Sequence, residues 1–342
     1  MNMRILVLEA AALLAMVSCA GRGGEEAAPT MEYASFFSIP DDSTLVSISP
    51  YDGSADTLRL EAPVRSLVCM SSSHVAFLDA LGLDSLASAV SGLKYISSPQ
   101  LRSRTDVADV GYDHELDYER ILAIGPDLVL AYSVSSVLPP YVSRLRSLGV
   151  KVFLVNEHLE DHPLARAEYV KLFGALGGRR GAADSLFAQI SERYLALRRE
   201  VPDDQRVKLL LNVPYAEQWY VPGKLNYMSR LIEDAGGTVL GAKEGRHDSS
   251  VMSLEQAYLL SRDADIWLNP GNVSTRSQLE ALNPMFSRFG VPRIYNNTLR
   301  VNSGGGNDFW ESGTLRPDLI LEDLVGIIGG RRDSFNYYIE VQ

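Results

Sequence analysis

Cysteine is almost absent from this chain, since only Cys19 and Cys69 occur among its 342 residues. Structural zinc and iron–sulfur sites take clusters of cysteine or histidine ligands, and the sequence has no cysteine cluster. Cys69 lies in an apolar stretch, where a free cysteine ordinarily serves as a small buried side chain. If Cys19 carries a lipid, no intrachain disulfide can form, so we expect neither a disulfide nor a metal site.

The N-terminus lacks an apolar run long enough to span a membrane. Residues 5–17 are apolar but contain Glu9, and about 14 residues in a helix reach only ~21 Å, short of the ~30 Å of a bilayer core. We therefore interpret residues 1–30 as a lipoprotein signal peptide and tether. Met16-Val17-Ser18-Cys19 resembles a bacterial lipobox, which implies a periplasm-facing or surface lipoprotein of the cell envelope, held to the membrane only through Cys19. The alternative is an ordinary secretory signal that is cleaved nearby.

Basic residues are too few to balance the acidic ones, because 32 Lys and Arg stand against 43 Asp and Glu and give a net charge of −11. An acidic surface does not attract nucleic acid or anionic lipid, so we expect neither as a partner. The motifs GxSxG, HExxH, GxGxxG and the P-loop are also absent. We expect no enzyme activity and no cofactor.

One segment, EHLEDH at 157–162, carries two histidines four residues apart. On a helix, this spacing would place both rings on one face, as in zinc sites. Pro163 directly follows His162, however, and favours a non-helical, solvated link. We expect no metal ligation here.

The chain does have a strong α/β pattern. Apolar residues at steps of three and four predict one long amphipathic helix over Arg180–Val201, about 20 residues or roughly 30 Å. Apolar strands alternate with helices on both sides of it, which predicts two lobes with parallel sheets joined by this backbone helix. The tail 335–341 is predicted as a last strand that pairs with an N-terminal ribbon. The predicted units are the signal peptide and tether at 1–30, a β-ribbon at 31–62, the N-terminal α/β lobe at 63–162, connecting helices at 163–201 and the C-terminal α/β lobe at 202–342.

The two predicted lobes contain similar helix starts. Asp117 and Ser253 are capping residues, and Glu119 and Glu255 follow each of them by two positions. A single acid in a first turn is explained by the helix dipole, worth about 0.3–1 kcal/mol. Its repetition at equivalent positions predicts instead a matched pair of surface carboxylates that dock onto a two-fold-symmetric partner.

Candidate ligand-binding residues follow core strands or lie in predicted loops, because the carboxyl ends of parallel strands line the ligand crevice of such folds. Tyr112 and Trp310 are the strongest candidates, and we expect them to face each other across a common crevice. For the others the alternative is an ordinary helix-cap or core position. The full set is Ser72, His74, Tyr112, Tyr132, Trp219, Asn307 and Trp310.

Three stretches, APVRSLVCMSSSHVAFLDALGL, DVGYDHELDYERILAIGPDLVLAY and LRSLGVKVFLVN, resemble the helical-backbone substrate-binding proteins of ABC importers for iron–siderophore, haem and cobalamin. The resemblance extends from about Val64 to Gly329. It implies a ligand held between two lobes and a permease dimer, with its ATPase, as the partner. Glu119 and Glu255 would then dock onto permease arginines. We expect the chain itself to be a monomer.

The resemblance leaves the cargo open. Tyr112 in VGY matches the position of a tyrosine iron ligand in some haem-binding members, and Arg246 and Arg276 are candidates for holding an anionic siderophore. The stretch 248–251 lacks the aromatic residues that cobalamin binders place before the second docking glutamate. We expect an iron chelate, either a siderophore or haem, with cobalamin as the alternative. A metal-dependent enzyme and a structural surface lipoprotein are more distant alternatives.

Overall fold

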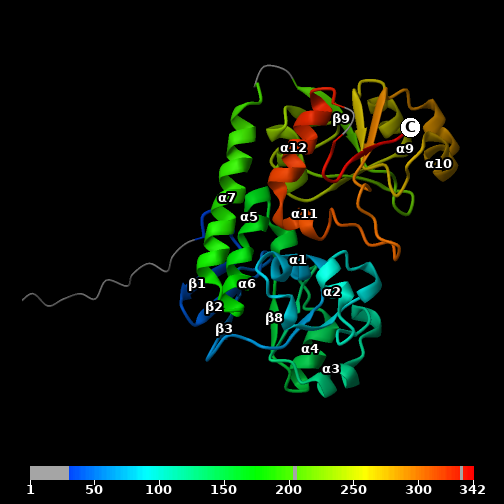
Figure 1. Cartoon of the computed structure of the whole chain (residues 1–342). Coiled ribbons are helices and arrows are strands. Elements are labelled where there is room, and N and C mark those ends of the chain that lie inside the picture. The colour runs from blue at the N-terminus through cyan, green and yellow to red at the C-terminus, as the bar shows by residue number, and fades with distance from the viewer. Residues whose placement is uncertain (1–30, 203–205, 332–333) are drawn as a thin grey trace, which may run out of the picture.

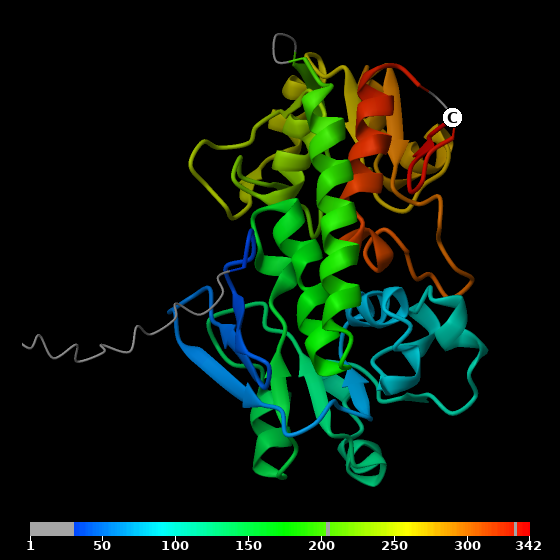
Figure 2. The same ribbon diagram turned by 60° about the vertical axis from the view of Figure 1, so that its left-hand side comes forward.

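The chain folds into two α/β lobes joined by one long helix, which confirms the predicted fold class (Figure 1). The computed structural model describes residues 31–202, 206–331 and 334–342, so Cys19 and the predicted signal peptide lie outside the described residues. Helix α7 (Arg180–Arg199) runs past both lobes (Figure 2). It packs on them through residues at the predicted helical spacing, Ala183, Phe187, Ile190 and Tyr194.

The first lobe contains a five-stranded parallel sheet in the order β6-β5-β4-β7-β8. Every residue of β4 and β7 is buried, as expected for a sheet covered on both faces. The strands are β4 (Leu67–Cys69), β5 (Ala87–Val90), β6 (Ala108–Asp109), β7 (Leu128–Ala131) and β8 (Val152–Leu154). The helices are α1 (Ser72–Ala80), α2 (Pro99–Ser103), α3 (Tyr118–Ile124) and α4 (Pro140–Ser147).

The second lobe contains a five-stranded sheet in the order β11-β9-β13-β14-β15, in which β15 is antiparallel. Its strands are β9 (Val207–Leu211), β11 (Gly237–Val239), β13 (Ile266–Leu268), β14 (Arg293–Asn296) and β15 (Ile339–Glu340), and β10 (Trp219–Val221) pairs separately with β12 (Ser250–Met252). Its helices are α8 (Tyr227–Asp234), α9 (Leu254–Ser261), α10 (Arg276–Leu282), α11 (Ser312–Leu315) and α12 (Pro317–Ile328). Helices α5 (Pro163–Glu168) and α6 (Val170–Leu176) lead from the first lobe into α7.

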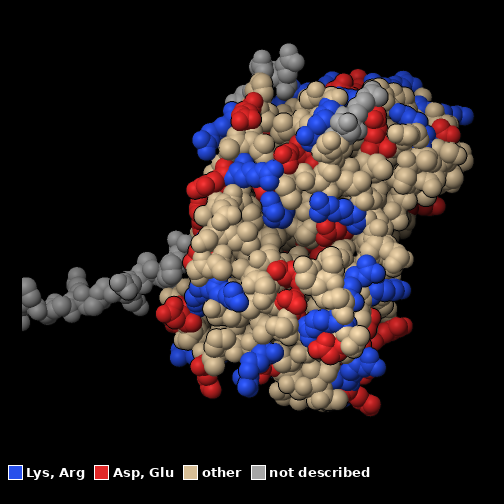
Figure 3. All heavy atoms as spheres, in the orientation of Figure 1, with Lys and Arg blue, Asp and Glu red and all other residues tan. Residues whose placement is uncertain are grey.

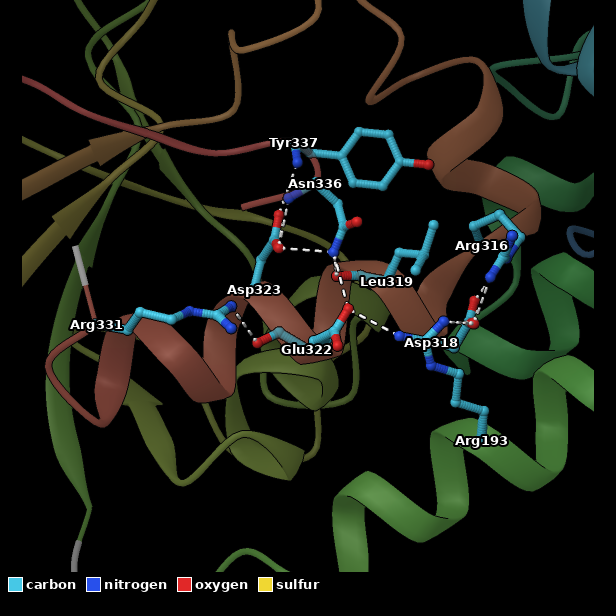
Figure 4. Close-up of polar contacts among 9 residues, drawn as sticks. All are labelled: Arg193, Arg316, Asp318, Leu319, Glu322, Asp323, Arg331, Asn336 and Tyr337. Atoms are coloured by element: carbon cyan, nitrogen blue, oxygen red, sulfur yellow. Dashed lines mark hydrogen bonds and ion pairs between the residues drawn. The ribbon is translucent and has the colours of Figure 1, made fainter. Parts of the chain in front are cut away.

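The C-terminal tail pairs within the second lobe, so its predicted pairing with the N-terminal ribbon is wrong. Glu340 in β15 is the register partner of Tyr295 in β14. The buried Asp323 carboxylate on α12 holds the tail there, because it accepts hydrogen bonds from the N–H groups of Asn336 and Tyr337, both at 2.7 Å (Figure 4). A sequence pattern cannot reveal such a long-range anchor.

Ion pairs fasten the backbone helix to the second lobe. The Arg193 guanidinium on α7 lies 2.8 Å from the Glu322 carboxylate and 3.6 Å from Asp318 on α12 (Figure 4). Arg316 forms a bidentate ion pair with the same Asp318, in which Nη2 and Nε donate to the two carboxylate oxygens at 2.7 and 2.9 Å. Helix α7 therefore contacts this lobe through ion pairs as well as through apolar side chains.

The predicted N-terminal β-ribbon is present. It is antiparallel and consists of β1 (Phe37–Asp41), β2 (Thr44–Ile48) and β3 (Ala55–Arg59). Two buried carboxylates hold the irregular segment that leads into it. Glu168 accepts hydrogen bonds from the N–H groups of residues 32–34, each at 2.8 Å, and Glu160 accepts from those of residues 35 and 36. The prediction of a solvated link at 157–162 is therefore wrong, since Glu157 and Glu160 are each only 3% exposed.

The surface carries charges of both signs. In the face drawn in Figure 3, acidic and basic side chains are interspersed over both lobes. Among the described residues, no helix is both long and apolar enough to cross a membrane.

Candidate ligand-binding site

A pocket of about 450 Å³ lies between the two lobes, a size typical of small-molecule sites. Ser72 and Tyr95 line it from the first lobe, and Ser72 opens α1 directly after β4. The second lobe supplies the other lining residues, which are Asn212, Asn269, Gly271, Asn272, Asn297, Thr298, Val301, Gly305, Gly306, Asn307 and Trp310.

A larger hollow of about 780 Å³ lies at the opposite end of the first lobe. Residues 58–65, 121–128 and 148–151 contribute its lining, and these segments precede β4, β7 and β8. The hollow therefore lies at the amino ends of the strands. Ligands of α/β sheets bind outside the carboxyl ends, so we assign the candidate site to the pocket between the lobes.

An asparagine stands at the carboxyl end of three neighbouring strands of the second lobe, either directly after the strand or as its last residue. Leu211, Leu268 and Tyr295 are aligned in the sheet register, and each is followed by an asparagine, namely Asn212, Asn269 and Asn296. The first two adopt left-handed backbone conformations, with φ of 67° and 56°. Asparagine is among the few residues that tolerate this region.

These asparagines have different partners. The Asn296 side chain is buried, and its Nδ2 donates to the carbonyl of Val273 at 2.8 Å, so it shapes the loop after β13. Asn212 Nδ2 donates to the carbonyl of Tyr220 at 3.3 Å. Asn269 Oδ1 and Thr298 Oγ1, both in the pocket lining, are buried atoms without a hydrogen-bond partner in the structure.

Two tyrosines meet on the first-lobe side of the pocket. The ring centroids of Tyr95 and Tyr112 lie 6.2 Å apart at an angle of 45°. Both rings pack over Gly92, where an added Cβ would lie 2.9 Å from Tyr112 Cε1 and 3.1 Å from Tyr95 Cδ2. Asp109 joins the two loops that carry the tyrosines, because its carboxylate accepts hydrogen bonds from the N–H groups of Gly92 and Gly111, both at 3.0 Å.

The surroundings shift the pKa values of the two phenols in opposite directions. Hydrogen bonds with Lys94 and Tyr112 lower the pKa of Tyr95, and the Lys94 ammonium lies 4.8 Å from the centre of the Tyr95 ring. Desolvation, together with the hydrogen bond to Tyr95, raises the pKa of Tyr112. Tyr95 is therefore the more acidic phenol, and it is the one that lines the pocket.

A glycine-rich loop of the second lobe closes directly onto the first lobe. A Cβ on Gly304 would lie 2.1 Å from the carbonyl oxygen of Lys94, and one on Gly306 would lie 1.8 Å from that of Tyr95. Asn302 Nδ2 donates to the carbonyl of Ile96 at 2.8 Å. Only glycine permits so close an approach of two backbones, so this loop fixes one side of the pocket.

Of the seven predicted ligand-binding residues, Ser72, Asn307 and Trp310 line the pocket, and the Trp310 side chain is 50% exposed. Tyr112 reaches it through its contact with Tyr95. Tyr132 is half-buried against His158, with ring centroids 5.8 Å apart, and is outside the pocket lining.

His74 and Trp219 lie in the core, and their prediction as ligand contacts is corrected. His74 is fully buried, its ring lies 5.8 Å from that of Phe173, and burial lowers its pKa to about 4. Trp219 belongs to strand β10 rather than to a loop. Its ring stacks on Trp267 at 5.9 Å, and its Nε1 donates to the carbonyl of Leu211 at 2.7 Å.

The two arginines proposed for an anionic ligand have other partners. Arg246 pairs with Asp248 at 2.5 Å, and Arg276 donates to the carbonyl of Pro292 at 3.0 Å. Neither lines the pocket between the lobes. Within the described part of the chain, no group of three or more His, Cys, Asp or Glu side chains is arranged to hold a metal ion.

Sequence reasoning missed Tyr95 and the pocket asparagines other than Asn307. Tyr95 falls in a stretch of the sequence that reads as irregular and polar, and its position depends on Asp109. The asparagines did leave a signal, since the three core strands of the second lobe read LLLN, IWLN and IYNN.

The two helix starts carry the predicted caps. Asp117 Oδ1 accepts a hydrogen bond from the N–H of Arg120 at 2.9 Å, and Ser253 Oγ accepts one from the N–H of Gln256 at 3.2 Å. Glu119 and Glu255 are both exposed in the first turns of α3 and α9. They lie on different lobes, outside the pocket lining.

Comparison with known sequences gives a family match. The periplasmic binding protein family model matches residues 67–288. An uncharacterized lipoprotein of Methanocaldococcus jannaschii is 24% identical over 305 residues, which cover 82% of this chain and 70% of that protein. An uncharacterized ABC transporter substrate-binding lipoprotein of Bacillus subtilis is 22% identical over 235 residues, covering 67% and 69%.

Comparison with solved structures gives the same two-lobed fold. A periplasmic heme-binding protein from Pseudomonas aeruginosa aligns with a TM-score of 0.59 at 19% identity, covering 82% of this chain and 98% of that one. A periplasmic vitamin B12-binding protein of Vibrio cholerae aligns with a TM-score of 0.57 at 14% identity, covering 79% and 99%.

Proposed function

Because the chain belongs to the periplasmic binding protein family, we propose that it is the substrate-binding component of an ABC importer and captures an iron chelate, a siderophore or haem, between its lobes. The observation that carries the proposal is the tyrosine pair. Tyr95 lines the first-lobe side of the pocket, and the Tyr112 ring lies beside it with the ring centroids 6.2 Å apart. Aromatic faces suit a large flat chelate, and a phenol oxygen can ligate iron where the chelate leaves a position open.

Delivery of the cargo requires a permease. In this proposal Glu119 and Glu255 dock onto basic pockets of a permease dimer, one from each lobe. Hydrogen bonding by Ser253 lowers the pKa of Glu255, so this carboxylate, like an ordinary glutamate, is ionised at neutral pH. A lipid on Cys19 would keep the protein near the permease, in line with the two relatives named as lipoproteins. No resident cofactor is needed, since the metal arrives with the cargo.

Cobalamin is the second candidate cargo. The specific observation that favours it is the uncharged, asparagine-rich wall of the second lobe, because carboxamide side chains suit a ligand rich in carboxamides. The similarity in fold to a vitamin B12-binding protein is compatible with either cargo.

Native mass spectrometry of the protein purified from its own host tests the proposal. We expect a co-purifying mass that matches an iron chelate or a corrinoid and that disappears on mild denaturation. Titration calorimetry with haemin, ferric siderophores and cyanocobalamin then identifies the class. A protein that carries no such mass and binds none of these compounds contradicts the proposed function.

A further inference from the structure

The second-lobe wall of the pocket is built from carboxamides. Among the described residues that line it, five are asparagines and none is charged. They come from the ends of β9, β13 and β14 and from the two loops that follow β13 and β14. The five are Asn212, Asn269, Asn272, Asn297 and Asn307.

Cations next to this wall already have partners. Arg300 is ion-paired with Asp308 at 3.3 Å, and its guanidinium lies 4.9 Å from the centre of the Tyr337 ring. Lys94 lies over the ring of Tyr95 on the opposite lobe. A ligand carboxylate would therefore find no unpaired cation among the described residues of the asparagine wall itself.

Two polar atoms of the wall are left without partners. Asn269 Oδ1 and Thr298 Oγ1 are both buried and unpaired, and buried polar groups are almost always hydrogen-bonded. Oδ1 can only accept a hydrogen bond, and the hydroxyl can donate as well as accept. The Asn269 side chain also lies beside the buried Tyr338 hydroxyl, with which it forms a hydrogen bond. A ligand that presents N–H or O–H groups suits a wall with spare acceptors, whereas a carboxylate would bring only acceptors.

We infer that this asparagine wall determines specificity and selects a metal chelate whose outer face is uncharged and carries carboxamide, hydroxamate or hydroxyl groups. The inference rests on the proposed function, since it concerns which chelate enters the same pocket. It places Asn212, Asn269 and Thr298 in direct contact with the ligand.

A purely conformational explanation exists for two of these residues. Asn212 and Asn269 have positive φ, and asparagine tolerates this region better than most residues do. Glycine adopts it without strain. Replacement by glycine therefore keeps the backbone and removes only the carboxamide, which separates the two explanations.

The test is titration calorimetry of the full-length protein with four probes. Ferrichrome and cyanocobalamin have no net charge and no carboxylate and are rich in amide groups, whereas haemin and ferric citrate carry carboxylates. We expect an uncharged probe to bind at least roughly 10-fold more tightly than either carboxylate probe. Asn269→Gly and Asn212→Gly should each weaken that binding by roughly 5- to 10-fold, the usual effect of one hydrogen bond, while the protein stays folded with only a small change in melting temperature.

Ala216→Gly is the matched control. Ala216 also has positive φ, at 46°, but is exposed and lies outside the pocket, so its replacement should leave binding unchanged. Tighter binding of haemin or ferric citrate would overturn the inference and leave the proposed function standing. Unchanged binding in both asparagine variants would also overturn it, because the asparagines would then serve only the backbone. Failure of every probe to bind would overturn the proposed function and the inference together.

Discussion

The carboxylate of Glu311 in the second lobe accepts a hydrogen bond from the backbone N–H of Ser98 in the first lobe at 2.8 Å. It accepts a second one from the backbone N–H of Ser97 at 2.7 Å. Glu311 is 2% exposed. Together with the glycine-rich loop, this contact fastens the two lobes beside the pocket. Ligand entry must therefore occur with little relative movement of the lobes on this side, or must break a buried charged contact.

The lobe contact should depend on pH. Burial raises the pKa of Glu311 from 4.5 to about 7, so between these values the folded protein holds a proton that the unfolded chain has released. The contribution of this group to the free energy of unfolding is therefore full below pH 4.5 and is lost as pH rises to about 7, by up to roughly 3 kcal/mol. Glu311→Gln removes the titration. As the pH rises from 4.5 to about 7, the unfolding free energy of the Glu311→Gln variant should therefore increase relative to that of the unsubstituted protein. Denaturant titrations at several pH values measure this, and a difference between the two proteins that stays constant with pH would contradict the assignment.

The tyrosine pair should matter for binding more than for stability. Tyr112→Ala and Tyr95→Ala should each weaken binding of the cargo chelate, while the melting temperature falls little, because Tyr95 lines the pocket, Tyr112 contacts it, and neither side chain is buried in the core. Trp219→Ala is the contrasting variant. Its ring is fully buried, so we expect a loss of about 3–5 kcal/mol in stability. Calorimetry and thermal melts distinguish the two patterns. A large loss of stability with normal binding in Tyr112→Ala would show that Tyr112 is a core residue and not a binding residue.

The paired glutamates should act only in transport. If Glu119 and Glu255 dock onto a permease, Glu→Arg at one position should reduce cargo uptake by cells, and reversal at both should reduce it further. The defect should depend on salt, because exposed charges act mainly through the rate of encounter. Cargo binding by the purified variants should be unchanged. Glu192→Arg on the exposed face of α7 is the control, and normal uptake in the double reversal would exclude the docking role.

The anchor prediction concerns a residue outside the described part of the chain. Cys19→Ala should move the protein from the membrane to the soluble fraction, because acyl chains supply about 0.8 kcal/mol of membrane affinity per buried CH₂. Cell fractionation with a carbonate wash measures this. Continued membrane association of the variant would show that another segment holds the protein.

The sequence was sufficient to predict elements that depend on local pattern. Helix α7 follows from apolar residues at a helical period, and the core strands follow from short apolar runs between turn residues. Contacts between distant segments left no such pattern. Glu160 and Glu168 are buried because their partners are backbone N–H groups more than 120 residues earlier, and exposed-looking acids cannot be recognised as buried from their own neighbours.

The same limit explains the misplaced and missed site residues. Trp219 lies among turn-forming residues, and only the pairing of β10 with β12 reveals it as a buried strand residue. Tyr95 enters the site because Asp109 ties its loop to that of Tyr112. Trp310 and Asn307, in contrast, could be found because a glycine-rich loop after a core strand marks the crevice directly.

The most direct test of the central claim is the position of the metal in crystals of the protein soaked with its cargo chelate. An anomalous difference map at the iron or cobalt absorption edge locates the metal without any assumption about the rest of the ligand. The account predicts one strong peak in the pocket between the lobes, bounded by Tyr95, Asn269 and Trp310. A peak in the larger hollow beneath the first lobe, or no ordered peak in protein that binds the chelate in solution, would contradict it.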